Sequence, residues 1–381
     1  MPSSHSFPSP HRIRFGRRHP IPEFISSNPI LEEFRWNKAR KWELRNLFGH
    51  INEFSGDQHG SRFIQQKLET ASPEERQAVF DEVMAGDPLA LIQDVFGNYV
   101  IQKMIEYGTS LQRSVLTSVM EGSIFRLSLQ VYGCRVIQKA IEHISLEQQS
   151  LIVGELEPRI LECVRDSNGN HVVQRLIEKV PSERLSFFAS FQGNVYDLSR
   201  HPYGCRVLQR CLEHLPEEQT RTLVYELHQN AVDLMKDQFG NYVIQFLVEH
   251  GQARDRALIV SNLQGQLLPM SRHKFASNVC EKALICADPQ TRRALIEEML
   301  AIGPETITPI MTMMQDQFAN YVLQRALLVA EGDQREELFN TVRQQLVSTR
   351  RVSAVVSKHV VSSKPCTAPF FQVLLLTSFP S

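Results

Sequence analysis

One short pattern of polar and apolar positions recurs eight times along the chain. Each copy has a polar or small residue, a planar or polar residue, two apolar residues and then Gln or Glu. The copies begin at Ser61, Asn98, Cys134, Asn170, Cys205, Asn241, Ser277 and Asn320, with successive spacings of 37, 36, 36, 35, 36, 36 and 43 residues. A fixed period of this size is typical of solenoids built from stacked helical repeats.

We number the five motif positions 1 to 5. At about 100° per residue on a helix, positions 1 and 5 lie on one face, position 2 flanks them, and positions 3 and 4 point away. Positions 3 and 4 carry Phe, Val, Ile, Leu and one Cys, so we predict that they are buried. Stacking eight such helices would align eight polar triplets along one surface.

Two further positions recur just before the motif. Asp stands four residues before position 1 in five copies, and Asp is a good helix N-cap. Gly or Ala directly precedes position 1 in all eight copies, although Gly in a helix costs about 1 kcal/mol relative to Ala. The six glycines in register indicate that another group approaches closely there, and crowding by the neighbouring repeat would explain it.

The repeats also set the domain organisation of the 381 residues. We predict a disordered basic tail over 1–25, a repeat domain over 26–364 and a divergent apolar tail over 365–381. Within the domain, helical capping structure covers 26–55, eight repeats run from about 56 to 348, and a capping helix pair begins within 342–364. The seven extra residues before the last motif predict a longer loop around 301–311.

Composition excludes several classes of protein. No run approaches the roughly 18 apolar residues that a membrane helix needs, so we expect no membrane association. The N-terminus lacks the apolar stretch of a secretory signal. The seven cysteines form no CxxC pair, which argues against a disulfide framework or a zinc site and favours a cytoplasmic location. We expect no cofactor, no metal and no catalytic residue.

The formal net charge of −1 hides an uneven distribution. Windows of seven residues from each motif start hold ten basic residues against Glu281 alone, a balance of +9. We therefore predict a local basic stripe on the motif surface, which is the electrostatic footprint of a nucleic-acid-binding protein. The basic residues are Arg62, Lys67, Lys103, Arg135, Lys139, Arg175, Arg206, Arg210, Lys282 and Arg325.

The motif chemistry matches the edges and faces of nucleic-acid bases. A Gln amide offers a donor and an acceptor in one plane, whereas the Glu281 carboxylate offers only acceptors and should select guanine, which presents two adjacent donors. The predicted base-edge residues are the pairs Ser61 and Gln65, Asn98 and Gln102, Cys134 and Gln138, Asn170 and Gln174, Cys205 and Gln209, Asn241 and Gln245, Ser277 and Glu281, and Asn320 and Gln324. The predicted stacking residues, at position 2, are Arg62, Tyr99, Arg135, His171, Arg206, Tyr242, Asn278 and Tyr321.

These eight motifs resemble the Pumilio homology domain of the Puf family of RNA-binding proteins, over roughly residues 30–360. The resemblance implies an all-α fold: a right-handed α-solenoid of eight three-helix repeats in a crescent, with terminal capping helices. It also implies single-stranded RNA on the concave face, running antiparallel with one base per repeat. Carried over motif by motif, the family's code gives the target 5′-UGUAUAUA-3′.

The resemblance further implies a biological role and partners. The family binds UGUA-containing elements in the 3′ untranslated regions of mRNA and recruits deadenylase and translational-repression proteins. We therefore expect post-transcriptional repression and mRNA decay by a cytoplasmic monomer. The longer loop before the last motif resembles one that some members use for protein partners.

Four other interpretations of the motif are a role in packing alone, an enzyme, a protein scaffold and nonspecific RNA binding. If the motif only packed repeats together, positions 3 and 4 would be explained, but not the polar residues at positions 1 and 5. An enzyme could use Cys134, Cys205 and His171, yet both cysteines occupy a position held by Ser and Asn elsewhere. An armadillo-type or HEAT-type scaffold for proteins would leave the basic stripe unexplained. A nonspecific RNA-binding protein would leave the regular code with its single Glu unexplained.

Overall fold

The computed structural model describes residues 28–37, 39–301 and 308–356. The regular elements in these ranges are helices only, without strands. The predicted tails over 1–25 and 365–381 lie outside the described residues, and so do residues 302–307 of the predicted loop. The described helices on either side of that loop end at Leu300 and begin at Pro309, as a longer connection there requires.

Each of the eight repeats contributes a short helix, a motif-bearing helix and an outer segment. The short helices are α2 (Ile51–Ser55), α5 (Pro88–Gln93), α8 (Ile124–Ser128), α11 (Ile160–Arg165), α13 (Val195–Ser199), α16 (Ala231–Lys236), α19 (Leu267–Ser271) and α22 (Pro309–Gln315). The motif helices are α3 (Gln58–Thr70), α6 (Gly97–Tyr107), α9 (Gly133–His143), α12 (Gly169–Lys179), α14 (Gly204–His214), α17 (Gly240–His250), α20 (Ala276–Cys286) and α23 (Ala319–Val329).

The outer segments are helical in seven repeats. They are α4 (Pro73–Ala85), α7 (Ser110–Met120), α10 (Leu146–Leu156), α15 (Glu217–Gln229), α18 (Ala253–Ser261), α21 (Pro289–Leu300) and α24 (Gly332–Val356). In the fourth repeat two 3₁₀ helices replace the outer helix, η3 (Ser182–Arg184) and η4 (Ser186–Phe191). A further 3₁₀ turn, η2 (Glu157–Arg159), joins α10 to α11.

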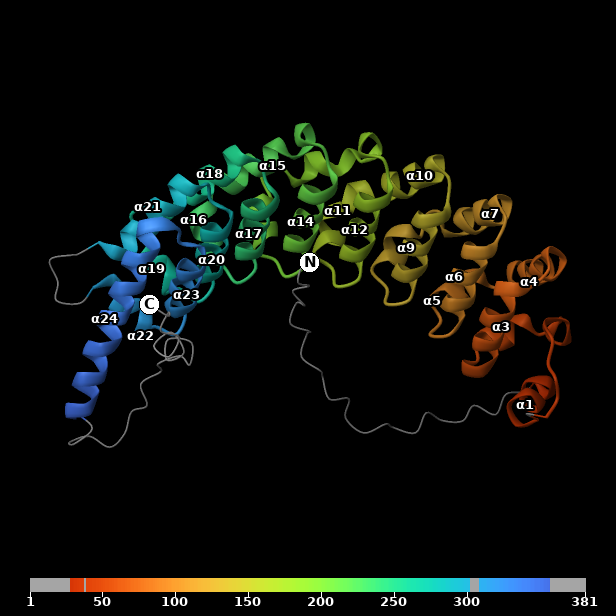
Figure 1. The fold of residues 1–381 in the computed structure, drawn as a ribbon. Coiled ribbons are helices and arrows are strands. Elements are labelled where there is room, and N and C mark those ends of the chain that lie inside the picture. The colour runs from red at the N-terminus through yellow and green to blue at the C-terminus, as the bar shows by residue number, and fades with distance from the viewer. Residues whose placement is uncertain (1–27, 38, 302–307, 357–381) are drawn as a thin grey trace.

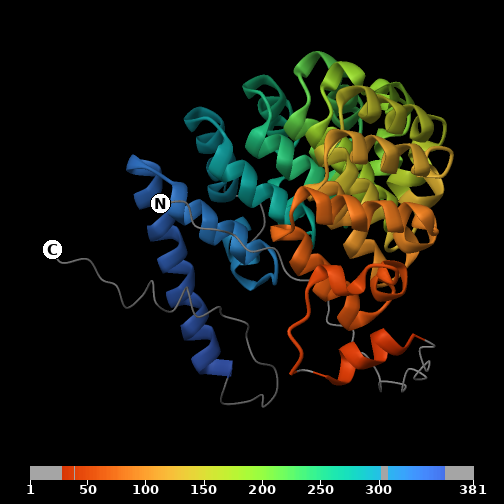
Figure 2. The same cartoon turned by 90° about the vertical axis from the view of Figure 1, so that its right-hand side faces the viewer.

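The repeats stack into a right-handed α-solenoid that curves as a crescent (Figure 1). The motif helices form the concave inner row and the outer segments form the convex row. Figure 2 views the arc from its N-terminal end, with the terminal helix α24 at the far end of the stack. The predicted all-α crescent of eight three-helix repeats is therefore confirmed.

The N-terminal cap consists of α1 (Pro29–Trp36) and η1 (Leu44–Leu47). The next helix, α2, holds the same place before its motif helix as α5 holds in the second repeat. The first structural repeat therefore begins near residue 50 rather than 56. At the other end, α24 is one continuous helix through residue 356, so the predicted pair of capping helices does not begin within 342–356.

In five repeats an Asp side chain bonds the backbone at the turn that leads into the motif helix. Asp94 Oδ1 accepts from the backbone N–H of Phe96 at 2.8 Å and of Gly97 at 2.7 Å. The other four predicted aspartates make the same pair of bonds, namely Asp57, Asp166, Asp237 and Asp316. Asp57 is the N-cap residue of α3, as predicted, whereas the other four aspartates stand two residues before the N-cap residue and cap the turn between the short helix and the motif helix.

The recurring glycine has its explanation within its own repeat. A Cβ on Gly133 would lie 2.6 Å from the carbonyl oxygen of Leu127, closer than real Cβ atoms come to another atom, and 3.1 Å from the Leu127 Cα. The same approach recurs at Gly60, Gly97, Gly169, Gly204 and Gly240, each against the residue six positions earlier. Close approach was predicted correctly, but the crowding comes mainly from the preceding short helix and not from the neighbouring repeat.

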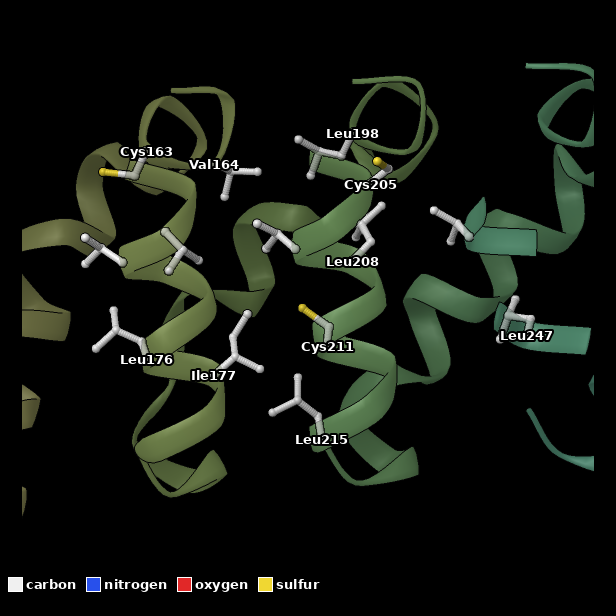
Figure 3. Close-up of a cluster of buried hydrophobic side chains, with 14 of the residues drawn as sticks. Cys163, Val164, Leu176, Ile177, Leu198, Cys205, Leu208, Cys211, Leu215 and Leu247 are labelled. Carbon is white, nitrogen blue, oxygen red and sulfur yellow. The ribbon is translucent and has the colours of Figure 1, made fainter. Parts of the chain in front are cut away.

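The core runs continuously between the rows. Motif positions 3 and 4 are buried in every repeat, except that Phe63 is half-buried. Figure 3 shows part of this core in the fourth to sixth repeats, where Leu176, Ile177, Leu208 and Cys211 lie between adjacent motif helices. In the described residues no helix is long and apolar enough to cross a membrane.

Candidate nucleic-acid interface

The motif helices present the same pattern of exposure in all eight repeats. Position 1 is buried, position 2 is exposed and position 5 is half-buried. The position 2 side chain of each motif helix is therefore open to solvent, and the position 5 side chain is only partly so. The eight motif helices that carry the sixteen predicted base-edge residues and the eight predicted stacking residues follow one another in a single row along the concave side (Figure 1).

In the four repeats with Asn at position 1, the two amides are bonded to each other. Asn98 Nδ2 donates to the carbonyl oxygens of Asp94 at 2.8 Å and Val95 at 3.1 Å, which leaves its Oδ1 to accept from Gln102 Nε2 at 2.9 Å. The same bond joins Gln174 to Asn170, Gln245 to Asn241 and Gln324 to Asn320. The Asn thus fixes the direction of the Gln amide, with the Gln oxygen directed away from the Asn.

Where position 1 is Cys, the Gln amide takes another partner. Gln138 Nε2 donates to the backbone carbonyl of Cys134, and Gln209 Nε2 donates to that of Cys205, both at 3.0 Å. In these repeats the Gln amide is therefore bonded to the backbone, and the Cys side chain beside it occupies less space than an Asn would. Burial raises the pKa of the Cys134 thiol and raises that of Cys205 to about 11, so neither thiol is poised to act as a nucleophile.

Position 2 provides flat surfaces between repeats. Tyr99, Tyr242 and Tyr321 are 40%, 47% and 57% exposed, unusually open for tyrosine. Arg135 Nη1 donates to Tyr99 Oη of the previous repeat at 3.3 Å. Although the His171 side chain is exposed, partial desolvation by its neighbours, with a smaller contribution from Arg206, lowers its pKa. These side chains present aromatic and guanidinium planes to which bases can stack.

The charge of this surface differs from the prediction. The seven-residue windows stopped two residues before a row of glutamates at position 9, and extending them to nine residues adds six glutamates and reduces the balance from +9 to +3. Four of the six glutamates pair with the basic residue at position 6 of the following repeat, and we call this row of glutamates the glutamate ladder. Its contacts are Glu69 with Lys103 at 2.7 Å, Glu142 with Arg175 at 3.4 Å, Glu178 with Arg210 at 3.2 Å and Glu249 with Lys282 at 2.7 Å.

Most of the predicted basic stripe is therefore neutralised along the edge of the motif row. Lys67 joins the same edge through Glu43 of the N-terminal cap, at 2.8 Å. The exposed cations of the motif itself are the position 2 arginines, Arg62, Arg135 and Arg206. Sequence reasoning missed the ladder, although a Glu eight residues after position 1 in six consecutive repeats was a visible signal.

Glu281 is the exception among the position 5 residues. Its carboxylate lies 3.6 Å from the Arg325 guanidinium of the next repeat. Burial raises the pKa of Glu281, while Arg325 and Lys282 act in the opposite direction. No group of three or more potential metal ligands occurs in the described residues.

The fold and this surface define a helical-repeat protein that presents one set of polar and planar side chains per repeat along its concave row. The model of the Pumilio-family RNA-binding repeat matches residues 50–84, 89–119, 123–157, 159–187, 194–228, 230–263, 266–300 and 310–342. The chain belongs to the Pumilio (Puf) family.

Relatives match over most of the chain. Pumilio homolog 1 of Xenopus laevis is 46% identical over an alignment of 435 residues, which covers 95% of this chain and 30% of the relative. The Pumilio domain-containing protein C6G9.14 of Schizosaccharomyces pombe is 32% identical over 352 residues, 90% of this chain and 50% of that protein. The chain thus spans half or less of the length of these two relatives.

Solved structures share the whole crescent. The Puf3 RNA-binding domain bound to a Cox17 RNA 3′ UTR recognition sequence (site B) has a TM-score of 0.83 and 36% identity, covering 91% of this chain and 100% of that one. PUF-8 in complex with PBE-RNA has a TM-score of 0.81 and 34% identity, covering 91% of this chain and 98% of that one. Both similar structures are complexes with RNA.

Proposed function

We propose that this chain reads single-stranded RNA on its concave face, one base per repeat, with the target 5′-UGUAUAUA-3′. The observation that carries the proposal is the fixed direction of the position 5 amides. Where Asn98 Oδ1 holds Gln102 Nε2 at 2.9 Å, the Gln oxygen and its second N–H remain to bond a base. Uracil offers an N–H beside a carbonyl oxygen and so matches that pair.

The other repeats differ from this arrangement in ways that fit other bases. At Cys134 and Cys205 the side chain beside the Gln is small, and the vacated space suits the larger adenine; Ser61 is assigned in the same way. Glu281, with Ser277 beside it, offers acceptors for the two adjacent donors of guanine. In the antiparallel direction of the family, the eighth repeat reads the first base and the first repeat reads the last.

We further propose that binding serves mRNA repression rather than catalysis. The Puf3 domain of known structure is bound to a 3′ UTR recognition sequence, which supports 3′ UTR elements as the targets here. Cytoplasmic mRNA, deadenylases and translational-repression proteins are the partners that this role would require. The buried, high-pKa thiols of the motif row support a binding function over nucleophilic chemistry.

The proposal is tested by fluorescence anisotropy at one fixed salt concentration, since phosphate contacts make affinity salt-dependent. The probes are 5′-UGUAUAUA-3′ and the same RNA with UGU changed to ACA. We expect a difference of several kcal/mol, because each lost base contact costs about 1–3 kcal/mol. Equal affinity for both RNAs would favour nonspecific RNA binding or a protein scaffold instead.

Glu281→Gln sharpens this test. The variant should lose about 1–3 kcal/mol on the guanine-containing RNA, the cost of one bidentate base contact. On an RNA with guanine replaced by adenine the loss should be much smaller. An equal loss on both RNAs would show that Glu281 does not read the base.

A further inference from the structure

The glutamate ladder lacks its glutamate at one step, between the seventh and eighth repeats. Position 9 of the seventh repeat is Ile285, which is 42% exposed, so Arg325 at position 6 of the eighth repeat has no ladder glutamate opposite it. Its guanidinium instead lies 3.6 Å from the carboxylate of Glu281. Residues 281 and 285 are one turn apart on α20 and lie on the same face of that helix.

In the seventh repeat the acidic residue stands at position 5 and an apolar residue stands at position 9, which links the ladder to the predicted base-edge position. In the intact steps the cation contacts a glutamate one turn beyond position 5, as Arg175 contacts Glu142. In the seventh repeat the acidic residue is Glu281, at position 5 and one turn before position 9. Arg325, at position 6 of the eighth repeat, contacts this residue. The repeat with an acidic position 5 is also one of two without an acid at position 9.

The environment of Glu281 disfavours a charged carboxylate unless a cation is nearby. Its side chain is 25% exposed, and removal of a carboxylate from water favours the neutral, protonated form. The charged groups acting on it are Arg325 from α23 and Lys282 on its own helix, and the Lys282 ammonium is paired at 2.7 Å with Glu249 on α17. Arg325 is therefore the main group that favours the charged carboxylate.

We propose that Arg325 is a positioning residue for guanine recognition, holding the Glu281 carboxylate charged and oriented toward the base in the seventh repeat. The proposal rests on the proposed RNA-reading function. The Arg325 contact is made to Oε2 of the carboxylate, and each carboxylate oxygen has two lone pairs, so acceptors remain for both donors of guanine. A cation that holds the acceptor in this way acts on specificity for one base and not on affinity for RNA in general.

The experiment measures the ratio of affinities for 5′-UGUAUAUA-3′ and 5′-UAUAUAUA-3′ in the wild type, Arg325→Gln and Arg325→Lys. We expect Arg325→Gln to reduce the ratio about tenfold, a loss on the order of one base contact. The reduction should grow as pH falls from about 8 to about 5.5. Without Arg325 the pKa of Glu281 should be higher than in the wild type, so the carboxylate of the variant is protonated first as pH falls. Arg325→Lys, which keeps the charge, should recover part of the ratio.

Arg175→Gln is the matched control, because Arg175 occupies the same position in the fourth repeat and contacts Glu142 and Glu178. It should leave the guanine ratio unchanged. Ile285→Glu tests the proposal without removing Arg325: the restored ladder glutamate should attract the guanidinium and also reduce the ratio. A purely structural role for Arg325 would not produce this effect.

Two results would overturn the proposal. If Arg325→Gln weakens both RNAs equally and leaves the ratio and its pH profile unchanged, Arg325 contributes only general affinity or stability. If wild-type protein itself shows no preference for the guanine-containing RNA, the proposed function fails, and the inference that depends on it fails too. The first result is seen only in the variant and the second in the wild type, so the two failures are distinguishable.

Discussion

Gln174 Nε2 donates to Asn170 Oδ1 at 2.9 Å, while Asn170 Nδ2 is held by the carbonyl oxygens of Asp166 and Ser167 at 2.8 and 2.9 Å. The Asn is fully buried, so its role in the free protein is to orient the Gln. A side chain that lacks an acceptor at position 1 cannot do so, and in the Cys repeats the Gln amide turns to the backbone carbonyl instead. Position 1 thus determines which group the position 5 amide bonds in the free protein.

Asn170→Cys should change the preference of the fourth repeat from uracil to adenine. The variant reproduces the arrangement seen at Cys134 and Cys205, where the Gln amide bonds the backbone and the small side chain leaves room for a purine. Competition binding of 5′-UGUAUAUA-3′ against 5′-UGUAAAUA-3′ should show a change in relative affinity of about 1–3 kcal/mol. Discrimination at the seventh base, assigned to the unaltered second repeat, serves as the internal control; unchanged preference at the fifth base would refute the role given to Asn170.

Tyr242→Ala should weaken binding to all RNA sequences by a similar amount. Tyr242 is exposed at position 2 of α17, and stacking on an aromatic ring contributes about 1–3 kcal/mol per base with little dependence on base identity. Anisotropy with RNAs altered at single positions measures the effect. Tyr225→Ala is the control, because this exposed tyrosine lies on the outer helix α15 and should not affect RNA affinity. A loss limited to one base at one site would contradict stacking.

The motif row could be predicted from sequence because it depends on local geometry. Helical periodicity alone places Val100 and Ile101 in the core and Asn98 beside Gln102, and the structure agrees at both places. The five aspartate caps are equally local, since each bonds N–H groups two and three residues ahead. The roles of these residues toward bases stay predictions until binding is measured.

Contacts between repeats could not be predicted in the same way. The ladder pairs Glu142 with Arg175, 33 residues apart in sequence, and only the stacking of α9 on α12 brings position 9 of one repeat opposite position 6 of the next. The crowding of Gly133 by Leu127 likewise depends on the angle between a short helix and its motif helix. Such distances follow from packing, which a repeating pattern of residue types does not specify.

In two of the three repeats that lack Asp before the motif helix, a histidine takes its place, which was not predicted from the sequence. At the same offset the fifth and seventh repeats carry His201 and His273, whose Nδ1 atoms accept from two backbone N–H groups each, at 3.2 Å for His201 and at 3.3 and 3.4 Å for His273. Only a neutral ring can accept at Nδ1. The pKa of each ring is lowered by burial, with further effects of Arg165 on His201 and Lys236 on His273.

These two histidines should make stability depend on pH. Because their folded-state pKa lies below the unfolded value of about 6.5, the unfolded chain binds more protons as pH falls. Their contribution is complete above that pH and is lost as pH falls through the folded-state pKa. In urea titrations the unfolding midpoint should fall from pH 7 toward pH 5, and His201→Asp with His273→Asp should reduce the change. His59→Gln, at an exposed histidine of α3, should not; an unaltered pH profile in the double variant would exclude the caps as its source.

Gly133→Ala should destabilise the solenoid although Ala is the better helix former. The added Cβ would lie 2.6 Å from the carbonyl oxygen of Leu127, a backbone atom that cannot yield without moving α8 against α9. Overpacking of this kind costs about 1–3 kcal/mol, more than the gain in helix propensity. Gly154→Ala is the matched control, since Gly154 lies inside α10 with nothing within 4 Å of an added Cβ, and it should stabilise the protein by about 0.5–1 kcal/mol. Chemical unfolding of both variants gives the sign of each change in the free energy of unfolding. If both substitutions stabilised the protein, the short helix would be free to shift, and crowding would not explain the recurring glycine.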